Sequence, residues 1–360
     1  MLLRLEPRTQ SSKWLQVASP LIAAALTIIT AFVLFGALGK NPVVALYTFA
    51  IQPLTTLYGL GELSIKAMPL MLCALGLSIG FRGNVWNIGA EGQLTFGAIA
   101  GGGVALWAYG NEGVWLLPTM IIAGGLGGML YGAIPAFLKN RFNTNEILTS
   151  LMLTYVSIQV LGYLVHGPWR DPDGFNFPET RMFNEVYGIF PVLIDGTRLH
   201  LGVVLALVAV VVVWVLMART FTGFQIEVGG QAPHAAAYAG YSQKRVVWLS
   251  FLIGGGLAGI AGMAEVAGVI GQLQPVISPG YGFAAIIVAF LGRLHPFGVL
   301  VASLLMSLMY IGGESLQMNM NLPLAVTGVF QGLLLFFVLG SDVLIRYRIR
   351  FASSRREALG

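Results

Sequence analysis

Long runs of apolar residues recur along the chain, separated by short polar connections. Two clear examples are 17–38 and 199–218, and neither contains Asp, Glu, Lys or Arg. A helix needs about 20 apolar residues to cross a bilayer, so each run predicts a membrane-spanning helix. The same pattern predicts ten membrane segments, at 16–38, 63–80, 88–108, 115–138, 146–166, 199–218, 247–269, 281–291, 295–313 and 322–340.

The eighth predicted segment, 281–291, is too short to span a bilayer on its own. We expect it to re-enter the membrane or to pack inside the protein, where irregular backbone is tolerated. The predicted fold class is therefore an all-α polytopic membrane protein with about ten transmembrane helices, including this short or re-entrant one.

Composition agrees with this class. Hydrophobic residues make up 56% of the 360 residues, charged residues only 10%, and the mean hydropathy is +0.79. Soluble domains carry roughly 25% charged residues. We expect the first run to stay in the mature protein, because it is longer than a signal peptide and lacks a small-residue cleavage site. The single cysteine, Cys73, excludes a disulfide framework within the chain and a site built from several cysteines.

The basic residues are divided unequally between alternate loops. One set of loops holds 15 of the 20 Lys and Arg residues, and the other holds 5, namely Lys40, Lys66, Arg170, Arg181 and Arg198. Cytoplasmic loops carry the excess of Lys and Arg, so both termini are predicted to be cytoplasmic. The resulting organisation is an N-terminal segment 1–15, a transmembrane domain 16–340 and a basic tail 341–360. The net charge of +5 then reports membrane topology rather than binding of nucleic acid.

Two loops stand out by length and composition. The external loop 167–198 is rich in Pro, aromatic and charged residues, and loops of this length are often functional. Either it folds on the surface as a cap or docking patch, or it is a spacer. The cytoplasmic loop 219–246 contains an Ala-rich stretch in which Pro233 suits a first helical turn and Gly240 suits a helix stop. A short helix over 233–239 is predicted there, either as a rigid knob for another protein or as an ordinary loop helix.

Small residues recur at four-residue spacing in three of the predicted helices. Lipid supplies no hydrophobic drive between helices, so faces of this kind stabilise a bundle by close backbone approach. The pattern predicts a densely packed bundle, through the following glycines: Gly97 and Gly101, Gly124, Gly128 and Gly132, and Gly255 and Gly259.

Several kinds of chemistry lack their motifs. No Walker-type phosphate loop occurs, so this chain is not expected to hydrolyse ATP. The four histidines are scattered without metal-ligand spacing, and no metal site is predicted. Ser78 lies in a G-x-S-x-G pattern at 76–80, but a serine nucleophile needs a base within hydrogen-bond reach. We therefore interpret Ser78 as a packing residue, with an intramembrane protease as the alternative.

Glu91 and Glu265 are the only acidic residues predicted to lie within membrane segments. A charge at that depth is expensive and indicates a functional site. Arg82, Asn87 and Gln93 are the nearest candidate partners of Glu91, and Asn87 shares its helix face. This face either lines a polar path or holds a helix start in place, and Glu265 is interpreted as facing a cavity.

Four motifs together resemble a known family. They are NIGAEGQ (87–93), NTNEILTSLMLTY (143–155), GGQAPHAAAYAGY (229–241) and GFAAIIVAFLGRLHPFGV (282–299). In this order and spacing they resemble the membrane permeases of bacterial ATP-binding-cassette (ABC) importers for ribose-like sugars and nucleosides. That group is related to the branched-chain amino acid permeases, and the resemblance covers residues 60–340. It is strongest to the longer permease of guanosine-type nucleoside importers, which implies a type II-like importer bundle.

The resemblance implies roles for particular residues. Asn87, Glu91 and Gln93 become candidates for lining the translocation path, to which the position of Glu265 adds a fourth. The cytoplasmic knob resembles the coupling helix that sits in a cleft of the ATPase subunit. Ala232 and Tyr241 depart from the family pattern there, and Ala232 removes an expected N-cap. The matching positions are Gly230, Pro233, Ala235, Ala236, Tyr238 and Gly240.

The implied partners follow from the same family. They are a separate ATPase subunit, which would bind the ATP and Mg²⁺, a second permease that is a copy or a related chain, and an extracytoplasmic binding protein or lipoprotein. The chain itself would need no cofactor, and it would lie in the bacterial plasma membrane. A nucleoside is favoured over a sugar as cargo. The alternative function is a proton-coupled secondary transporter that uses Glu91 or Glu265.

Overall fold

The computed structural model describes residues 2–7, 13–111, 113–323 and 325–352. The chain divides into two compact units. Residues 53–311 form one, the bundle unit, and residues 1–52 with 312–360 form the other, the terminal unit. Each unit is described by itself below.

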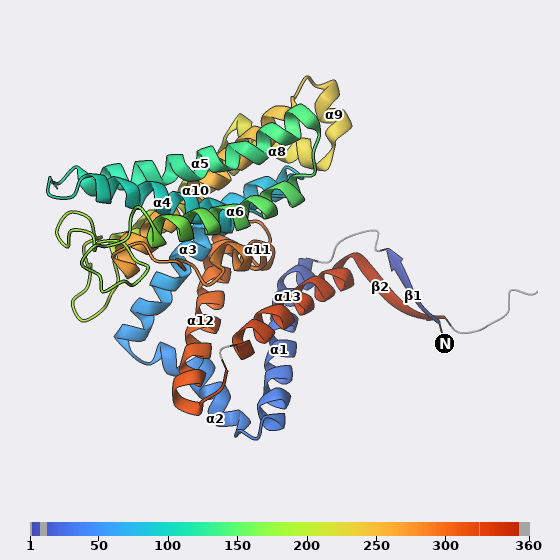
Figure 1. Cartoon of the computed structure of the whole chain (residues 1–360). Coiled ribbons are helices and arrows are strands. Elements are labelled where there is room, and N and C mark those ends of the chain that lie inside the picture. Colours follow the sequence, from blue (N-terminus) through green and yellow to red (C-terminus); the bar gives the residue numbers. More distant parts are fainter. Residues whose placement is uncertain (1, 8–12, 112, 324, 353–360) are drawn as a thin grey trace, which may run out of the picture. The chain divides into compact units, whose positions relative to one another are not determined.

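The bundle unit is helical (Figure 1). α10 packs against α3, α4 and α5, and therefore lies at the centre of the unit. Its elements are α3 Leu57–Arg82, α4 Ala90–Trp107, α5 Leu116–Phe142, α6 Glu146–His166, α7 Leu201–Arg219, α8 Phe221–Gln231, α9 Pro233–Tyr238, α10 Gln243–Glu265, a π-helical turn Val266–Ile270, α11 Tyr281–Leu291 and the greater part of α12 Pro296–Met320.

Glycines set the spacing between the central helices. A Cβ atom added at Gly97 of α4 would lie 2.2 Å from the Cα of Gly259 in α10, and one added at Gly128 of α5 would lie 2.1 Å from the carbonyl oxygen of Gly255. Neither helix pair has room for a side chain at these points. The predicted close approach of these helices is therefore confirmed, and its small residues are what permits it.

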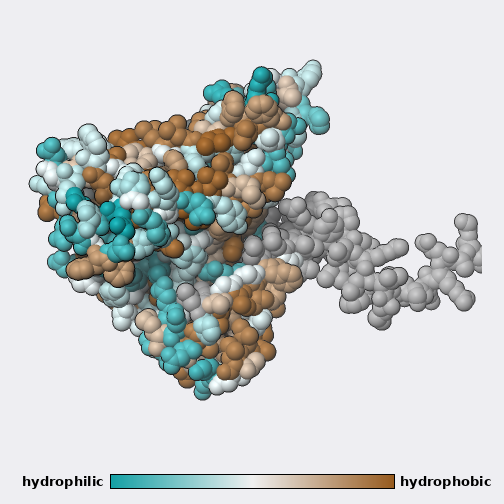
Figure 2. Space-filling model, viewed as in Figure 1, coloured by the Kyte–Doolittle hydropathy of each residue, from teal (hydrophilic) through white to brown (hydrophobic). Residues whose placement is uncertain are grey.

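The two ends of the bundle unit differ in charge and in structure. Arg82, Lys139 and Arg219 lie in the last turns of α3, α5 and α7, at the end where α8 and α9 lie. The long loop 167–198 lies at the opposite end (Figure 1). Figure 2 shows apolar surface along α5 and its neighbours between the more polar loop end and the tip at α9. The sequence-based division of the basic residues therefore corresponds to two opposite ends of this unit.

The long loop is folded onto the bundle rather than free. Backbone N–H groups of Thr180, Phe183 and Phe190 donate to the carbonyl oxygens of Leu273, Gly271 and Ala267. The Gln272 side chain donates to the Glu179 carboxylate at 2.7 Å. These bonds run along the segment that follows α10, so the loop folds as a cap on this end of the bundle unit instead of hanging free as a spacer.

The terminal unit contains α1 Lys13–Ala37, α2 Pro42–Leu46, a π-helical turn Tyr47–Ile51 and α13 Ala325–Arg346. Phe330 of α13 packs edge-on against Phe35 and Phe49, with ring centroids 5.3 and 5.4 Å apart. The short 3₁₀ turn Gln52–Leu54 continues the chain toward α3.

One pair of short strands interrupts the helical pattern of the described chain. β1 Leu2–Pro7 pairs antiparallel with β2 Tyr347–Ala352, with Leu2 opposite Ala352. This ribbon takes up parts of the predicted N-terminal segment and basic tail. The rest of that tail, 353–360, lies outside the described residues.

Six helices are long and apolar enough to cross a membrane, by length and composition, among the residues that the structure describes. Each of the ten predicted segments contains a helix, and the bounds of 146–166 and 281–291 are those of α6 and α11. The chain is a multi-pass membrane protein, and ten crossings stay a prediction. The six are Leu57–Arg82, Leu116–Phe142, Glu146–His166, Leu201–Arg219, Gln243–Ile270 and Pro296–Met320.

Candidate functional site

The polar residues before α4 form a closed network at the helix start. The Asn87 and Gln93 side-chain amides bond to each other in both directions, at 2.9 and 3.3 Å. Asn87 Oδ1 also accepts from the Gly89 N–H at 2.9 Å, and the Ile88 N–H donates to Ser150 Oγ of α6 at 3.1 Å. Both amides are only 2% exposed, so the network satisfies polar groups that water does not reach.

Glu91 links the start of α4 to the start of α11. Its carboxylate is 5% exposed, and Oε2 accepts a 2.6 Å hydrogen bond from the Gly282 N–H. Ser278 and Gly280 lie beside the same carboxylate, and the Gly280 N–H donates to Ser278 Oγ at 3.1 Å. Because the first N–H groups of a helix have no partner within it, a carboxylate there is stabilising. Of the two roles predicted for this face, holding a helix start is the one these contacts support.

Close approach at this junction depends on glycine. A Cβ added at Gly282 would lie 2.2 Å from the Glu91 backbone nitrogen, and one added at Gly92 would lie 2.7 Å from the Thr154 Cα in α6. The start of α4 is therefore packed directly against α6 and α11. We call the network of Asn87, Glu91, Gln93, Ser150 and Gly282 the α4 junction.

A second polar cluster lies where the long loop meets the start of α3. Arg198, from the long loop, donates to both carboxylate oxygens of Glu62 in α3, at 2.8 and 2.7 Å. This bidentate pairing is the stronger form of an ion pair, and it raises the pKa of Arg198 further above its ordinary range. Sequence reasoning missed the pair, because it began the helix at 63 and left Glu62 in a loop. α3 begins at Leu57 and therefore includes Glu62. That Glu91 and Glu265 are the only acidic residues within membrane segments stays a prediction.

Glu265 and His200 lie near this cluster. Glu265 ends α10, is 6% exposed, and leaves Oε2 without a hydrogen-bond partner. His200 precedes α7, where Nδ1 accepts from the Gly202 N–H at 3.2 Å, and its ring stacks on Phe190 at 5.5 Å. Burial, with the positive charge of Arg198, lowers the pKa of His200 to about 4. His200 is therefore neutral at pH 7.

The structure brings three of the four path candidates together and leaves the fourth apart. Asn87, Glu91 and Gln93 meet in the α4 junction, whereas Glu265 lies at the far end of α10. Their role in lining a path stays a prediction. Ser78 donates to the Leu75 carbonyl oxygen in its own helix at 2.7 Å and is 1% exposed, as a packing residue would be.

The short helix predicted within loop 219–246 is present. α9 spans Pro233–Tyr238, with Pro233 at its first position, and Gly240 follows at φ +81°. Ala232 makes no side-chain cap, so the helix begins without the bond that an Asn would supply. Tyr238 is 97% exposed at the tip.

The helix is held rigidly by the elements around it. A Cβ added at Gly230 would lie 1.9 Å from the Arg82 carbonyl oxygen, so α8 crosses the end of α3 at backbone contact. Tyr241 packs edge-on against Phe221 and Phe224 of α8, with centroids 5.8 and 6.4 Å apart. α9 is therefore connected to the end of α3 through the packed backbone of α8.

The six coupling positions do not all face outward. Ala236 is 3% exposed and packs inward, whereas Pro233, Ala235, Tyr238 and Gly240 are exposed. A partner would therefore contact the exposed positions, and Ala236 would support the fold of the helix. The sequence could not assign these directions, because six residues are too few for a helical periodicity.

Arg82 makes a long-range hydrogen bond that the sequence did not indicate. Its Nε donates to the Leu294 carbonyl oxygen at 3.0 Å, in a turn where Arg293 and Leu294 both have positive φ, at 54° and 57°. Arg82 therefore joins the end of α3 to the α11–α12 connection. The sequence suggests Arg82 as a partner of Glu91, and the hydrogen bond to Leu294 is made instead.

Comparison with known proteins decides the family. Residues 59–339 match the family described as the permease component of the branched-chain amino acid transport system. The chain belongs to this permease family. The expected resemblance is thereby confirmed, and the matched range 59–339 is nearly the range 60–340 expected from the sequence. No solved structure matches the permease.

Relatives of the permease are described as sugar or nucleoside transporter subunits. It is 35% identical to a glucose ABC transporter permease protein of Haloferax volcanii, over 98% of this chain and 95% of that one. It is 30% identical to a guanosine ABC transporter permease protein of Bacillus subtilis, over 84% and 86%. It is 28% identical to a nucleoside ABC transporter permease protein of Lactococcus lactis, over 91% and 92%.

Proposed function

We propose that this permease is the membrane subunit of an ATP-driven importer and forms the path for a nucleoside or a simple sugar. An extracytoplasmic binding protein or lipoprotein delivers the cargo to the outer end. A separate ATPase subunit binds ATP and Mg²⁺ and docks on α9. A second permease, either a copy or a related chain, completes the path, and both termini lie in the cytoplasm of a bacterial plasma membrane.

One observation carries this proposal. The permease has a short, exposed helix fixed to the basic end of a tightly packed bundle, as a surface that receives force from another subunit would require. Tyr238 stands 97% exposed at its tip, while Gly230 holds α8 against the backbone of α3. The family match supports the same assignment, since ABC permeases work with an ATPase and a substrate-binding protein.

The mechanism follows from differential affinity. ATP binds better to the ATPase pair when it is closed, so binding moves the docked α9 helices together and shifts the bundle between two states. Within the bundle, the α4 junction keeps the starts of α4 and α11 in register while the helices move. We assign Asn87, Glu91 and Gln93 this positioning role, alongside the predicted lining of the path.

The test separates docking on α9 from folding. Tyr238→Asp changes only an exposed side chain at the tip, so the permease should fold normally but lose association with the ATPase subunit and coupled ATP hydrolysis. Phe175→Asp is the matched control, because Phe175 is 93% exposed in the long loop at the other end. ATPase association is measured by co-purification from detergent. Normal association and hydrolysis in Tyr238→Asp would contradict the docking role.

Ala236 is unsuitable for that test. A bulky charged residue at this 3% exposed position would disrupt α9 itself, so lost hydrolysis would not report on docking.

A further inference from the structure

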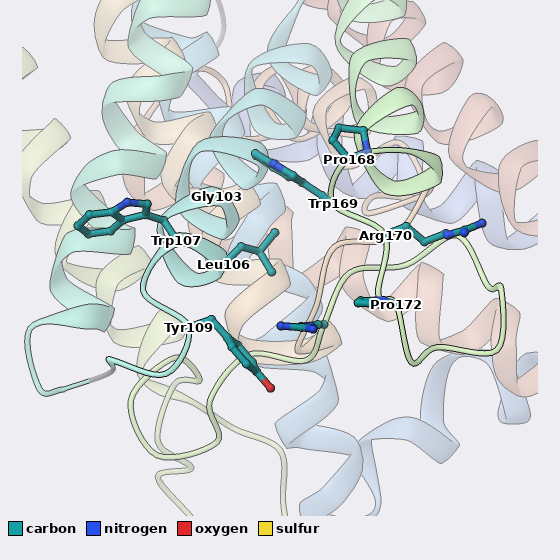
Figure 3. A pocket seen from close by; sticks show the side chains of 9 residues that line it. Gly103, Leu106, Trp107, Tyr109, Pro168, Trp169, Arg170 and Pro172 are labelled. Atoms are coloured by element: carbon teal, nitrogen blue, oxygen red, sulfur yellow. The ribbon is translucent and has the colours of Figure 1, made fainter.

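A pocket of about 530 Å³ opens at the outer end of the bundle unit, between the end of α4 and the long loop (Figure 3). Pockets that bind small molecules usually measure roughly 300 to 1,000 Å³. Both sides of the pocket belong to the same unit, and the loop that forms one side is hydrogen-bonded to the segment after α10. The pocket is therefore a built feature of this end of the permease.

Aromatic rings form two of its walls. The Trp169 ring lies against α4 at Gly103, where an added Cβ would come within 2.9 Å of the indole. Only glycine leaves space for the ring at that point. The Tyr109 ring forms a second wall (Figure 3). The Arg181 guanidinium lies over this ring, 4.9 Å from its centroid. Flat walls of this kind bind planar ligands by stacking.

The polar side chains of the pocket are mainly hydrogen-bond donors. Arg170 uses one N–H on Asn176 Oδ1 at 2.6 Å, and Arg181 lies 3.7 Å from an Asp171 carboxylate oxygen. Each guanidinium has five N–H groups, so both keep donors for a ligand. Among the residues that line this pocket, the only side-chain acceptor is the Tyr109 hydroxyl.

This combination selects among the cargo classes of the named relatives. Every sugar hydroxyl carries a donor hydrogen, so a sugar offers no edge made of acceptors alone. A guanidinium pairs in bidentate fashion with O6 and N7 of a purine, which are both acceptors. Adenine presents an amino donor instead of O6, and it would face the guanidinium unfavourably. The pocket therefore fits a base with an acceptor edge and a stacking face.

We propose that this outer pocket binds the base of a 6-oxopurine nucleoside, such as guanosine or inosine. Trp169 stacks on the base, and Arg170 or Arg181, the latter held over the Tyr109 ring, binds its O6 and N7 edge. The inference rests on the proposed function, in that it takes the cargo to be a nucleoside, and it adds a binding site on the permease itself. The site holds cargo at the outer face independently of the binding protein.

The experiment measures binding to the assembled transporter, purified in detergent without its binding protein. Guanosine and inosine should bind and alter tryptophan fluorescence, and adenosine and glucose should bind at least tenfold more weakly. Arg170→Lys and Arg181→Lys keep the charge but lose the planar fork, so at least one should weaken guanosine binding about tenfold. Trp169→Phe keeps a ring and should bind more tightly than Trp169→Leu.

The matched control is Arg219→Lys. Arg219 also lies over an aromatic ring, 5.7 Å from the Trp214 centroid, but at the cytoplasmic end. It should leave guanosine binding unchanged. Equal binding of glucose or adenosine, displacement of guanosine by inorganic phosphate, or an equal loss in the control would each overturn the proposal.

A parallel assay separates this inference from the proposed function. ATP-driven uptake of labelled guanosine is measured with the binding protein present. Uptake without guanosine binding at the pocket would refute the pocket alone. Pocket binding without ATP-driven uptake of any nucleoside would refute the proposed nucleoside importer and leave the binding site standing as a property of the chain.

Discussion

Replacing Glu91 tests whether the α4 junction positions helices. The Gly282 N–H donates to its buried carboxylate at 2.6 Å, and Ser278 and Gly280 lie beside the same group. Glu91→Gln leaves one acceptor oxygen and turns an amide N–H₂ toward a donor. Because hydrogen bonds to a charged group are stronger than neutral ones and a buried unpaired donor is costly, we expect a loss of about 2 kcal/mol in unfolding free energy.

Glu91→Ala removes all of these acceptors and the packing of the side chain. The buried N–H of Gly282 is then unpaired and a cavity remains, so the expected loss is about 4 kcal/mol. The control is Glu146→Gln at the start of α6. Its carboxylate pairs with Lys139 at 2.9 Å at a partly exposed site, where such a pair contributes about 0.5 kcal/mol.

The assay combines thermal unfolding in detergent with uptake by the reconstituted transporter. If Glu91 positions helices, the unfolding temperature should fall in the order wild type, Glu91→Gln, Glu91→Ala. Uptake per folded Glu91→Gln molecule should stay close to wild type. A Glu91→Gln protein with unchanged stability and no uptake would refute this reasoning and assign Glu91 to the cargo or to proton coupling.

Three further predictions concern packing, the outer ion pair and pH. Gly259→Ala places a Cβ 2.2 Å from the Gly124 carbonyl oxygen and should lower the unfolding free energy by about 3 kcal/mol. Gly162→Ala, whose Cβ would meet nothing within 4 Å, should be neutral or stabilising by up to about 1 kcal/mol. Equal effects of the two substitutions would contradict the packing argument. A double-mutant cycle of Glu62→Gln and Arg198→Gln should give a coupling of about 1 kcal/mol that shrinks in high salt, because Arg198 is half exposed; zero coupling at low salt would show that the pair is not stabilising. The pKa of His200 is lowered from 6.5 to about 4, so between these pH values the unfolded state binds more protons than the folded state. The contribution of His200 to the unfolding free energy is therefore full above pH 6.5 and is lost as the pH falls toward 4. The loss is on the order of 3 kcal/mol. His200→Asn keeps an N-cap acceptor and should remove that part of the pH dependence of the unfolding temperature; an unchanged pH profile would contradict it.

Residues typical of helix ends predicted the bounds of two helices correctly. Asn145 accepts from the N–H groups of Ile147 and Leu148, so α6 begins where the sequence placed it. Pro233 and Gly240 likewise predict the bounds of the short helix α9 to within one residue. Such signals act within a few residues and are therefore readable in one sequence.

Long-range pairing limited the prediction of the site. The predicted segment 63–80 leaves Glu62 in a loop, but Arg198 pairs with it from 136 positions away, and α3 begins at Leu57. The two readings of Glu91 stayed open for the same reason, since its partner Gly282 is 191 positions away. Which distant residue neutralises a buried charge depends on the fold and not on local pattern.

The central claim is that this permease is a gate moved by a separate ATPase. The most direct measurement is uptake of labelled nucleoside or glucose into proteoliposomes, with the complete assembly and with the permease pair alone. Accumulation should require the ATPase subunit, ATP and the binding protein, and an uncoupler should leave it unchanged. Accumulation by the permeases alone, abolished by an uncoupler, would contradict the account and favour proton coupling through Glu91 or Glu265.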